Sequence, residues 1–392
     1  MAGCGAWAST TRRCSTSTIS SSSPRWTTRP TTGRRRNGGS RLITTSSPAR
    51  RAASRLAAAA GLAVLVASLA AAPARAQFTL GEQRAGTASG TFLKIGVGAR
   101  ATGLGEAFVA VANDPSAIYW NPAGLASIQQ REVGFSHIEW PADIRYEHVA
   151  MVLPVRRLGG SLAFQFGVLS TAIDETSELQ PFGTGRTFVY SDMIAGVAYA
   201  RRWTDKLLVG FGSKFVHENL GTDVGGPTTS AVLFDIGSIY YLGLGSVRVA
   251  TSLTNFAPAF KPKGTFLSTG PDGITGTADD EVRSYDGFDA PTMFRYGIAF
   301  EPIENGSVRL TTSLEANQPA DNAQALKAGL EWAWAGRLAL RTGYNFNADA
   351  LKFSAGAGVN ADLGSWRATL DYAYTNGGFL GAVNRATLAV RF

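Results

Sequence analysis

The chain has 392 residues, including 45 glycines and only two cysteines, with a formal net charge of +8 and a mean hydropathy of zero. Residues 1–76 contain 12 of the 37 Lys and Arg residues and no Asp or Glu. Residues 77–392 therefore have 25 basic and 29 acidic residues, and this slight negative charge argues against a nucleic-acid-binding protein. Both cysteines, Cys4 and Cys14, also precede residue 77, which excludes disulfides, cysteine-ligated zinc and cysteine nucleophiles from the remainder.

Residues 50–76 predict a secretory signal peptide. Three arginines precede an apolar run over residues 56–72, and residues 74–76 supply an Ala-x-Ala cleavage motif, so cleavage is expected before Gln77. The alternative, a retained membrane anchor, is disfavoured because this mostly Ala run is short and weakly apolar for a bilayer span. Residues 1–49 are rich in Ser, Thr and Arg, and we expect a disordered extension that arises from a start codon assigned too far upstream.

Residues 77–130 are predicted to form a small N-terminal hatch. They show no alternation of apolar and polar residues, so they cannot form barrel wall. Asp114-Pro115 and Asn121-Pro122 each place a capping side chain before a proline that suits the first helical turn, and Ala123-Gly124 follows the second pair. The segment therefore predicts two short helices that can lie inside the lumen of a barrel.

Residues 131–392 repeat a pattern of about ten alternating residues followed by a turn, which is typical of transmembrane β-strands. In residues 366–374, for example, Leu370 belongs to an apolar face and Thr369 to a polar face. The even number of strands predicts an all-β transmembrane barrel of about 14 antiparallel strands. The strands are expected near residues 131–139, 146–155, 160–170, 191–201, 206–217, 230–241, 245–255, 293–301, 307–317, 325–334, 337–346, 351–361, 365–375 and 384–392.

The connections between these strands alternate in length. If the first strand rises from the periplasm, every periplasmic connection is short, at residues 156–159, 202–205, 242–244, 302–306, 335–336 and 362–364. The longest connections, residues 171–190, 218–229 and 256–292, then all lie outside the cell. Short periplasmic turns and long external loops characterise outer-membrane barrels, whereas a soluble β-sandwich has no reason to sort its loops in this way. The pattern predicts a bacterial outer-membrane location and outer-membrane lipid as a partner.

The chain ends on an alternating strand with a terminal Phe392. This ending resembles the signal by which the barrel-assembly machinery recognises outer-membrane proteins. We therefore expect Phe392 to act as an insertion signal and that machinery to be a partner.

The hatch region contains a distinctive run of residues over 98–108, followed by Asp114-Pro115-Ser116-Ala117 and Tyr119-Trp120-Asn121-Pro122-Ala123-Gly124-Leu125. These residues, above all the last two motifs, resemble the N-terminal signature of the PorV/PorQ family, which is related to the FadL long-chain fatty-acid transporters. The resemblance implies a FadL-like barrel of fourteen strands with an Asn-Pro-Ala element in its hatch. PorV-like proteins act with the type IX secretion machinery, whereas FadL-like proteins carry hydrophobic molecules through a hatch-controlled opening in the wall.

No sequence motif indicates an enzyme or a cofactor. The HExxH, GxSxG and Walker patterns are all missing, and we expect the chain not to be an enzyme. The loop that contains Asp272, Asp279, Asp280 and Glu281 offers a weak Ca²⁺ candidate, but it lacks EF-hand spacing and a solvated acidic loop is favoured. No other metal ligand set is expected.

Three functions stay open. The first is a PorV/PorQ-type protein that works in secretion or transport across the outer membrane, with secreted cargo proteins and secretion-complex subunits as partners. The second is a FadL-like transporter whose partners are long-chain fatty acids or other hydrophobic small molecules. The third is a structural or adhesive barrel that acts through the loop 256–292.

Overall fold

The computed structural model describes residues 86–392 apart from residues 177–178, 271–275 and 279. The expected extension over residues 1–49, the expected signal peptide over residues 50–76 and the start of the expected hatch therefore lie outside the described residues. Among the residues described, no helix is both long enough and apolar enough to cross a membrane.

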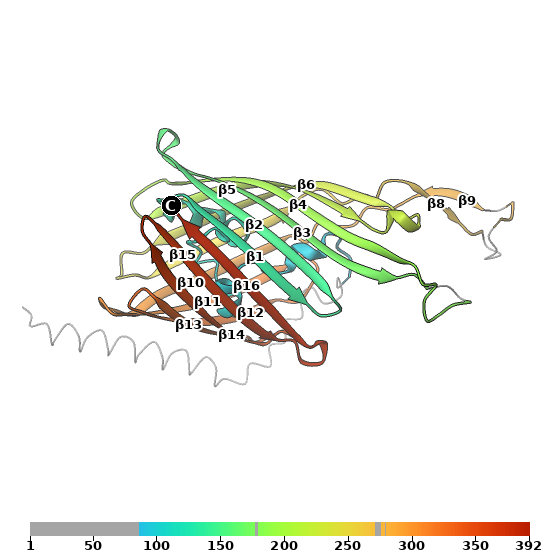
Figure 1. Cartoon of the computed structure of the whole chain (residues 1–392). Coiled ribbons are helices and arrows are strands. Elements are labelled where there is room, and N and C mark those ends of the chain that lie inside the picture. Colours follow the sequence, from blue (N-terminus) through green and yellow to red (C-terminus); the bar gives the residue numbers. More distant parts are fainter. Residues whose placement is uncertain (1–85, 177–178, 271–275, 279) are drawn as a thin grey trace, which may run out of the picture. The chain divides into compact units, whose positions relative to one another are not determined.

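Fourteen strands form a closed antiparallel barrel in which β1 pairs with both β2 and β16 (Figure 1). The barrel strands are β1 (Glu132–Trp140), β2 (Ile144–Val155), β3 (Gly160–Asp174), β4 (Thr187–Arg202), β5 (Leu207–Asn219), β6 (Thr228–Tyr241), β7 (Arg248–Phe256), β10 (Met293–Glu304), β11 (Val308–Pro319), β12 (Ala325–Trp334), β13 (Leu338–Asn345), β14 (Phe353–Leu363), β15 (Trp366–Asn376) and β16 (Ala382–Arg391). The fourteen predicted strands are confirmed, and each connects to its neighbour in chain order as a meander does. Three single-turn helices, η4 (Arg156–Leu158), η5 (Thr222–Val224) and η6 (Gly378–Leu380), lie in the connections.

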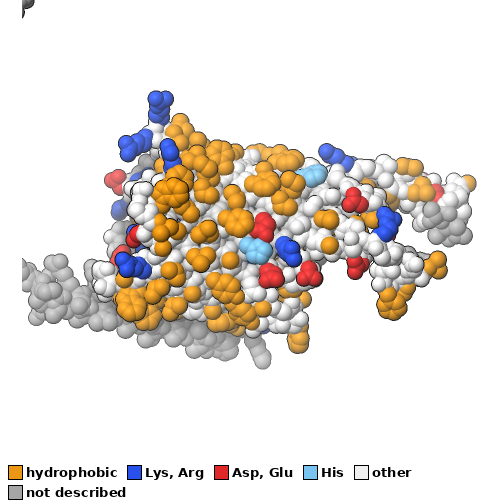
Figure 2. Space-filling model, viewed as in Figure 1, with side chains coloured by type: hydrophobic (Ala, Val, Ile, Leu, Met, Phe, Trp, Pro, Cys, Tyr) orange, Lys and Arg blue, Asp and Glu red, His pale blue; other side chains and the backbone are white. Residues whose placement is uncertain are grey.

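The predicted faces of the strands are also confirmed. On β15 the side chain of Leu370 is 58% exposed on the outer wall, whereas Asp371 is buried in the lumen. Figure 2 shows a broad area of apolar side chains on this outer wall, with Lys and Arg side chains at the end of the barrel that carries the short turns. Apolar side chains suit lipid contact, while the barrel pairs its backbone polar groups between strands.

The loop over residues 256–292 contains two strands that the sequence did not predict. They are β8 (Thr265–Ser268) and β9 (Glu281–Ser284), which pair only with each other and project away from the barrel in Figure 1. Each has four residues, too few for the alternation that identified the barrel strands. At the base of the same loop, Phe260 is fully buried and pairs with Phe288.

Residues 86–130, here called the luminal segment, cross the lumen from the long-loop end to the short-turn end. The segment begins at a bridge between Ala88 and Asp289 of the loop that contains β8 and β9, and it ends where β1 starts. It contains the short helices η2 (Thr91–Lys94), α2 (Ala99–Gly103), α3 (Ala117–Trp120) and η3 (Pro122–Ser127). Its apolar side chains form much of the buried core, including Phe92, Leu93, Val97, Leu104, Phe108, Ile118, Trp120 and Leu125.

Candidate functional site

Asn121 fixes the luminal segment against the barrel wall. Its side chain is fully buried, and its Oδ1 accepts a hydrogen bond from the Ala123 backbone N–H at 3.1 Å, so it caps η3 as predicted. Its Nδ2 donates to the carbonyl oxygen of Val109 at 3.0 Å and to that of Ser238 on β6 at 3.2 Å. One amide therefore joins two parts of the segment to the wall.

The wall opposite Asn121 and Pro122 is made of glycine. A Cβ atom at Gly237 would lie 2.0 Å from the Asn121 Oδ1, and one at Gly210 would lie 2.3 Å from the Pro122 carbonyl carbon. Gly124 is equally constrained, because a Cβ atom there would lie 2.2 Å from the Ala112 carbonyl oxygen. The structure thus brings the predicted residues Asn121 to Gly124 together where the segment meets β5 and β6.

Asp114 and Pro115 lie elsewhere in the lumen. The Asp114 Oδ1 accepts hydrogen bonds from the Ser116 backbone N–H at 3.0 Å and from the Ser116 Oγ at 2.6 Å. Asp114 therefore stabilises the turn before α3 rather than capping the helix as predicted, because α3 begins only at Ala117, with Ser116 at its N-cap. Pro115 packs close to Gly134 on β1. The two Pro-containing pairs predicted from the sequence are therefore two separate contacts with the wall rather than one site.

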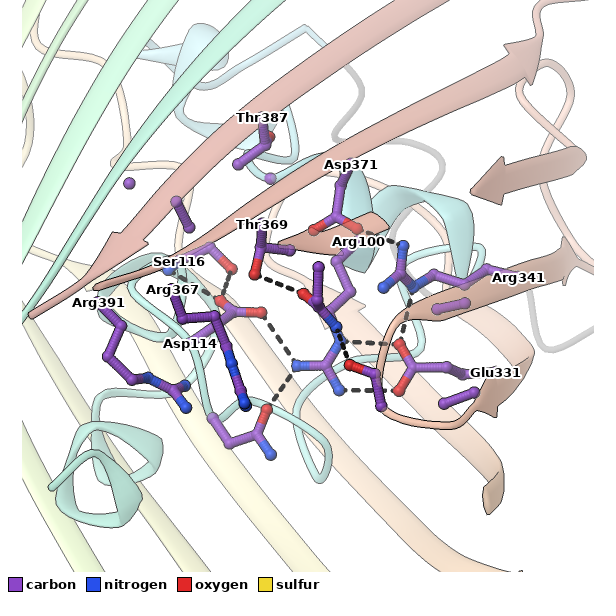
Figure 3. Close-up of a pocket in the computed structure, with 18 of the residues that line it drawn as sticks. Arg100, Asp114, Ser116, Glu331, Arg341, Arg367, Thr369, Asp371, Thr387 and Arg391 are labelled. Carbon is purple, nitrogen blue, oxygen red and sulfur yellow. Dashed lines mark hydrogen bonds and ion pairs between the residues drawn. The ribbon is translucent and has the colours of Figure 1, made fainter. Parts of the chain in front are cut away.

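An ion-pair network links Asp114 to the opposite wall through Arg100 (Figure 3). The Arg100 Nη1 donates to Asp114 at 3.2 Å, and its Nε and Nη2 donate to the two carboxylate oxygens of Glu331 at 2.8 and 3.0 Å. Glu331 also accepts from the Nε of Arg341, whose Nη1 reaches Asp371 at 2.7 Å. Burial alone would lower the pKa of the Arg100 guanidinium, but the Glu331 carboxylate raises it above its usual value.

Further charged anchors hold the luminal segment on other strands. Glu315 on β11 accepts hydrogen bonds from the backbone N–H groups of Phe108 and Val109, at 2.8 and 2.7 Å. Lys327 on β12 donates to Glu106 at 2.7 Å. Burial raises the pKa of the Glu106 carboxyl, but the positive charges of Lys327 and Arg385 outweigh it and leave that pKa below its usual value.

Alternation of apolar and polar residues along the strands predicts inward positions for Glu315, Lys327, Glu331 and Arg341, but it does not identify these residues as anchors. The structure pairs them with the luminal segment or with each other. A usable signal was available, because charged residues at several inward positions require partners when the lumen is filled. Which charges would meet could not be read from alternation alone.

A polar cavity of about 520 Å³ remains at the short-turn end of the lumen. Its lining includes Arg100, Asp114, Glu331, Arg367 and Arg391, several of which appear in Figure 3. Most of the charges are paired: Arg367 pairs with Asp362, and Arg391 pairs with Glu132. The cavity is therefore a polar vestibule whose walls are largely ion-paired.

Phe392 and the acidic loop lie apart from the luminal segment. The Phe392 backbone N–H donates to the Arg131 carbonyl oxygen, and its ring lies 6.1 Å from that of Trp366 on the outer wall; its role as an insertion signal stays a prediction. Asp272 and Asp279 of the weak Ca²⁺ candidate lie outside the described residues. Asp280 accepts from the backbone N–H groups of Gly270 and Gly276, and Glu281 pairs with Arg283.

Comparison with known proteins identifies one family model and several similar folds. The model of an uncharacterised protein family, UPF0164, matches residues 65–200, and no curated protein matches the chain. The toluene transporter TbuX of Ralstonia pickettii has a TM-score of 0.50 at 13% identity, over 76% of this chain and 97% of that one. The toluene transporter TodX of Pseudomonas putida scores 0.45 at 13% identity over 70% and 93%, and Omp33 of Acinetobacter baumannii scores 0.37 at 10% over 67% and 98%.

At 13% identity the similarity to TbuX shows the fold. A closed barrel with an apolar outer wall is the form in which β-strands cross a membrane, because closure leaves no unpaired strand edge. The chain is an outer-membrane β-barrel whose fold is similar to that of TbuX.

Proposed function

We propose that this chain is a closed outer-membrane barrel of the PorV/PorQ type that works in protein secretion by presenting its outer loops to secreted proteins. The observation that carries the proposal is the anchoring of the luminal segment to the wall on several sides of the barrel. Its partners are Glu218 on β5, Ser238 on β6, Glu315 on β11 and Glu331 on β12. A barrel filled in this way acts at its ends.

The energetics of these anchors disfavour an aqueous pore. Removing one partner of a buried ion pair typically costs about 3–5 kcal/mol, because the other charge is left buried without a partner. Withdrawal of the luminal segment would separate Arg100 from Glu331 and Glu106 from Lys327 in one movement. Such a movement cannot be a frequent thermal event, so the lumen is closed to hydrophilic solutes at rest.

The outer loops carry large apolar side chains that none of the described residues covers. Leu179 and Phe182 in the β3–β4 loop are 94% and 102% exposed, and Phe379 in η6 is 111% exposed. These side chains lie beyond the strands rather than on the lipid-facing wall. Exposed apolar groups at the outer end of the barrel offer contact points for another protein, and a secreted polypeptide that emerges at the cell surface supplies such a partner.

Genetic complementation in the source bacterium tests the proposal. Deletion of the gene should leave secreted proteins trapped in the periplasm, and the wild-type gene should restore their appearance at the surface. The double variant Phe182→Ser and Phe379→Ser should insert normally yet fail to restore secretion, while the control Asp349→Ser, which replaces an exposed charged side chain in another outer loop, should restore it. Normal secretion in the deletion strain would overturn the proposal.

A second function, transport of hydrophobic small molecules, is favoured by a groove of about 470 Å³ on the outer wall. Phe211, Ile236 and Phe294 flank the groove, while the small side chains of Ser238 and Thr251 form its floor and share a hydrogen bond of 2.9 Å. On the inner side of the same part of the wall, Gly237 lies against Asn121. The groove thus presents an apolar surface on the part of the wall whose inner side places a glycine against Asn121, and TbuX is a toluene transporter.

Uptake of radiolabelled toluene by cells that express the chain measures this second function. The variant Thr251→Leu fills the groove and should lower uptake, whereas Ser213→Leu, elsewhere on the outer wall, should not. Uptake equal to that of cells without the chain would reject the transport function and leave the secretion proposal intact.

A further inference from the structure

Three polar side chains lie in a row at the long-loop end of the lumen. Asp192 on β4 pairs in register with Glu218 on β5, which pairs in register with Thr229 on β6. All three face the lumen, with exposed fractions of 2%, 3% and 0%. Residues in register on neighbouring antiparallel strands lie about 4.5–5.5 Å apart at their Cα atoms, so Glu218 is an immediate neighbour of both Asp192 and Thr229.

Two oxygen atoms of this row have no hydrogen-bond partner. The Glu218 oxygens accept from the Ser89 Oγ at 2.7 Å and the Gly90 backbone N–H at 2.8 Å, and one Asp192 oxygen accepts from the Tyr190 hydroxyl at 3.0 Å. The other Asp192 oxygen, Oδ1, and the Thr229 Oγ1 are buried and unpaired. Buried polar atoms without a partner are uncommon and costly, so two of them in one row of three residues require an explanation.

The row also differs from the rest of the lumen in its charge. Among the described residues, eight carboxyl side chains are buried, and six of them lie within ion-pair distance of a Lys or Arg. The six are Glu132, Asp235, Glu315, Asp321, Glu331 and Asp371. Asp192 and Glu218 are the two that have no such partner within the described part of the chain, and they are directly opposite each other.

Two buried carboxylates side by side repel each other and lose their hydration, so a positive charge between them relieves both costs. The available donors are carboxylate and hydroxyl oxygens, which are the ligands of hard divalent cations. We propose that Asp192, Glu218 and Thr229 bind a divalent cation, with Ca²⁺ the best fit to this donor set. Because Glu218 also holds Ser89 and Gly90, the cation ties the start of the luminal segment to β4, β5 and β6.

Ca²⁺ titration of the chain purified from the outer membranes of an expressing bacterium, after EDTA treatment and dialysis, tests this site. We expect saturable Ca²⁺ binding by calorimetry, Tb³⁺ luminescence on excitation of tyrosine because Tyr190 contacts Asp192, and a Ca²⁺-dependent rise in the temperature at which the folded gel band is lost. Asp192→Asn should weaken Ca²⁺ binding by at least about tenfold and remove most of that rise.

Two further variants keep the test decisive. Thr229→Val removes a ligand oxygen without changing charge, so it should weaken Ca²⁺ binding even if Asp192→Asn fails to fold. The double variant Asp280→Asn and Glu281→Gln removes two acids from the loop candidate and should bind Ca²⁺ as the wild type does. If the wild-type protein does not bind Ca²⁺ and Asp192→Asn makes the protein more heat-stable, the site is overturned in favour of a proton shared by Asp192 and Glu218. If the loop variant loses Ca²⁺ binding, the site is overturned in favour of the loop.

Discussion

The two faces of the barrel wall are built from the same strands but follow different rules. On β12 the outward side chains Leu330, Trp332 and Trp334 are 44–61% exposed and have only to be apolar, because lipid accepts any such surface. The inward side chains Lys327 and Glu331 are buried, and each contacts one particular charge of the luminal segment. Residues on the outer face are therefore interchangeable within a class, whereas residues on the inner face are specific. The luminal segment is part of the core of this protein rather than an accessory to it.

The largest difference in stability between a change on the inner face and one on the outer face is expected for Glu331→Gln. This change leaves Arg100 and Arg341 buried beside a neutral amide, so the free energy of unfolding should fall by about 3–5 kcal/mol. Urea unfolding of the barrel in lipid vesicles, followed by tryptophan fluorescence, measures it. The matched control is Glu139→Gln, an exposed acid on the outward side of β1, which should leave the urea midpoint unchanged. Equal shifts of the urea midpoint for the two variants would mean that the interior charges are solvated and do not stabilise the fold.

The next largest effect compares neighbours on one strand. Leu370→Arg places a charge on the lipid-facing wall, which costs about 2–4 kcal/mol near the bilayer centre, whereas Thr369→Arg enters the polar vestibule and can be hydrated. Leu370→Arg should therefore assemble poorly and Thr369→Arg well. Heat-modifiable gel mobility of the refolded proteins measures the difference. Assembly of both variants to the same extent would contradict the assignment of faces.

Much of the fold could be predicted from the sequence because the rules of the outer face are local. A strand that must be apolar on one side and polar on the other leaves a period of two, and this identified every barrel strand from β1 to β16. The pair β8 and β9 escaped because strands of four residues outside the membrane need no such pattern. Turn chemistry likewise identified Asn121, whose capping bond to Ala123 is a local contact.

The rest of the site could not be predicted, because it depends on contacts across the lumen. Arg100 and Glu331 are 231 positions apart, and nothing in alternation says which inward charge faces which part of the luminal segment. The contact between Asn121 and Gly237 could not be predicted for the same reason. Gly237 resembles any other small residue of a barrel strand until Asn121 is seen to occupy the space that a side chain would fill.

The smallest effect is expected for Asn121→Ala, which tests the contact between the luminal segment and the inner face of the wall. The change removes the cap of η3 and the hydrogen bond to the Ser238 carbonyl, and loss of such a cap costs about 0.5–2 kcal/mol. The charged anchors at Glu315 and Glu331 remain, so the luminal segment should stay in place but open locally more often. In a planar bilayer, we expect the variant to show brief, infrequent conductance steps on a closed baseline.

Deletion of residues 113–125 supplies the upper limit for this measurement. The deletion removes Asp114 and the whole Asn-Pro-Ala-Gly turn but no wall strand, so the barrel should still insert and should conduct small hydrophilic solutes steadily. Asn121→Ala should then fall between the parent and the deletion, because one capping bond is a small part of what holds the segment. A deletion variant that inserts yet conducts no more than the parent would show that the charged anchors alone close the lumen, and the Asn121 contact would then serve only to position η3 against the glycines of β5 and β6.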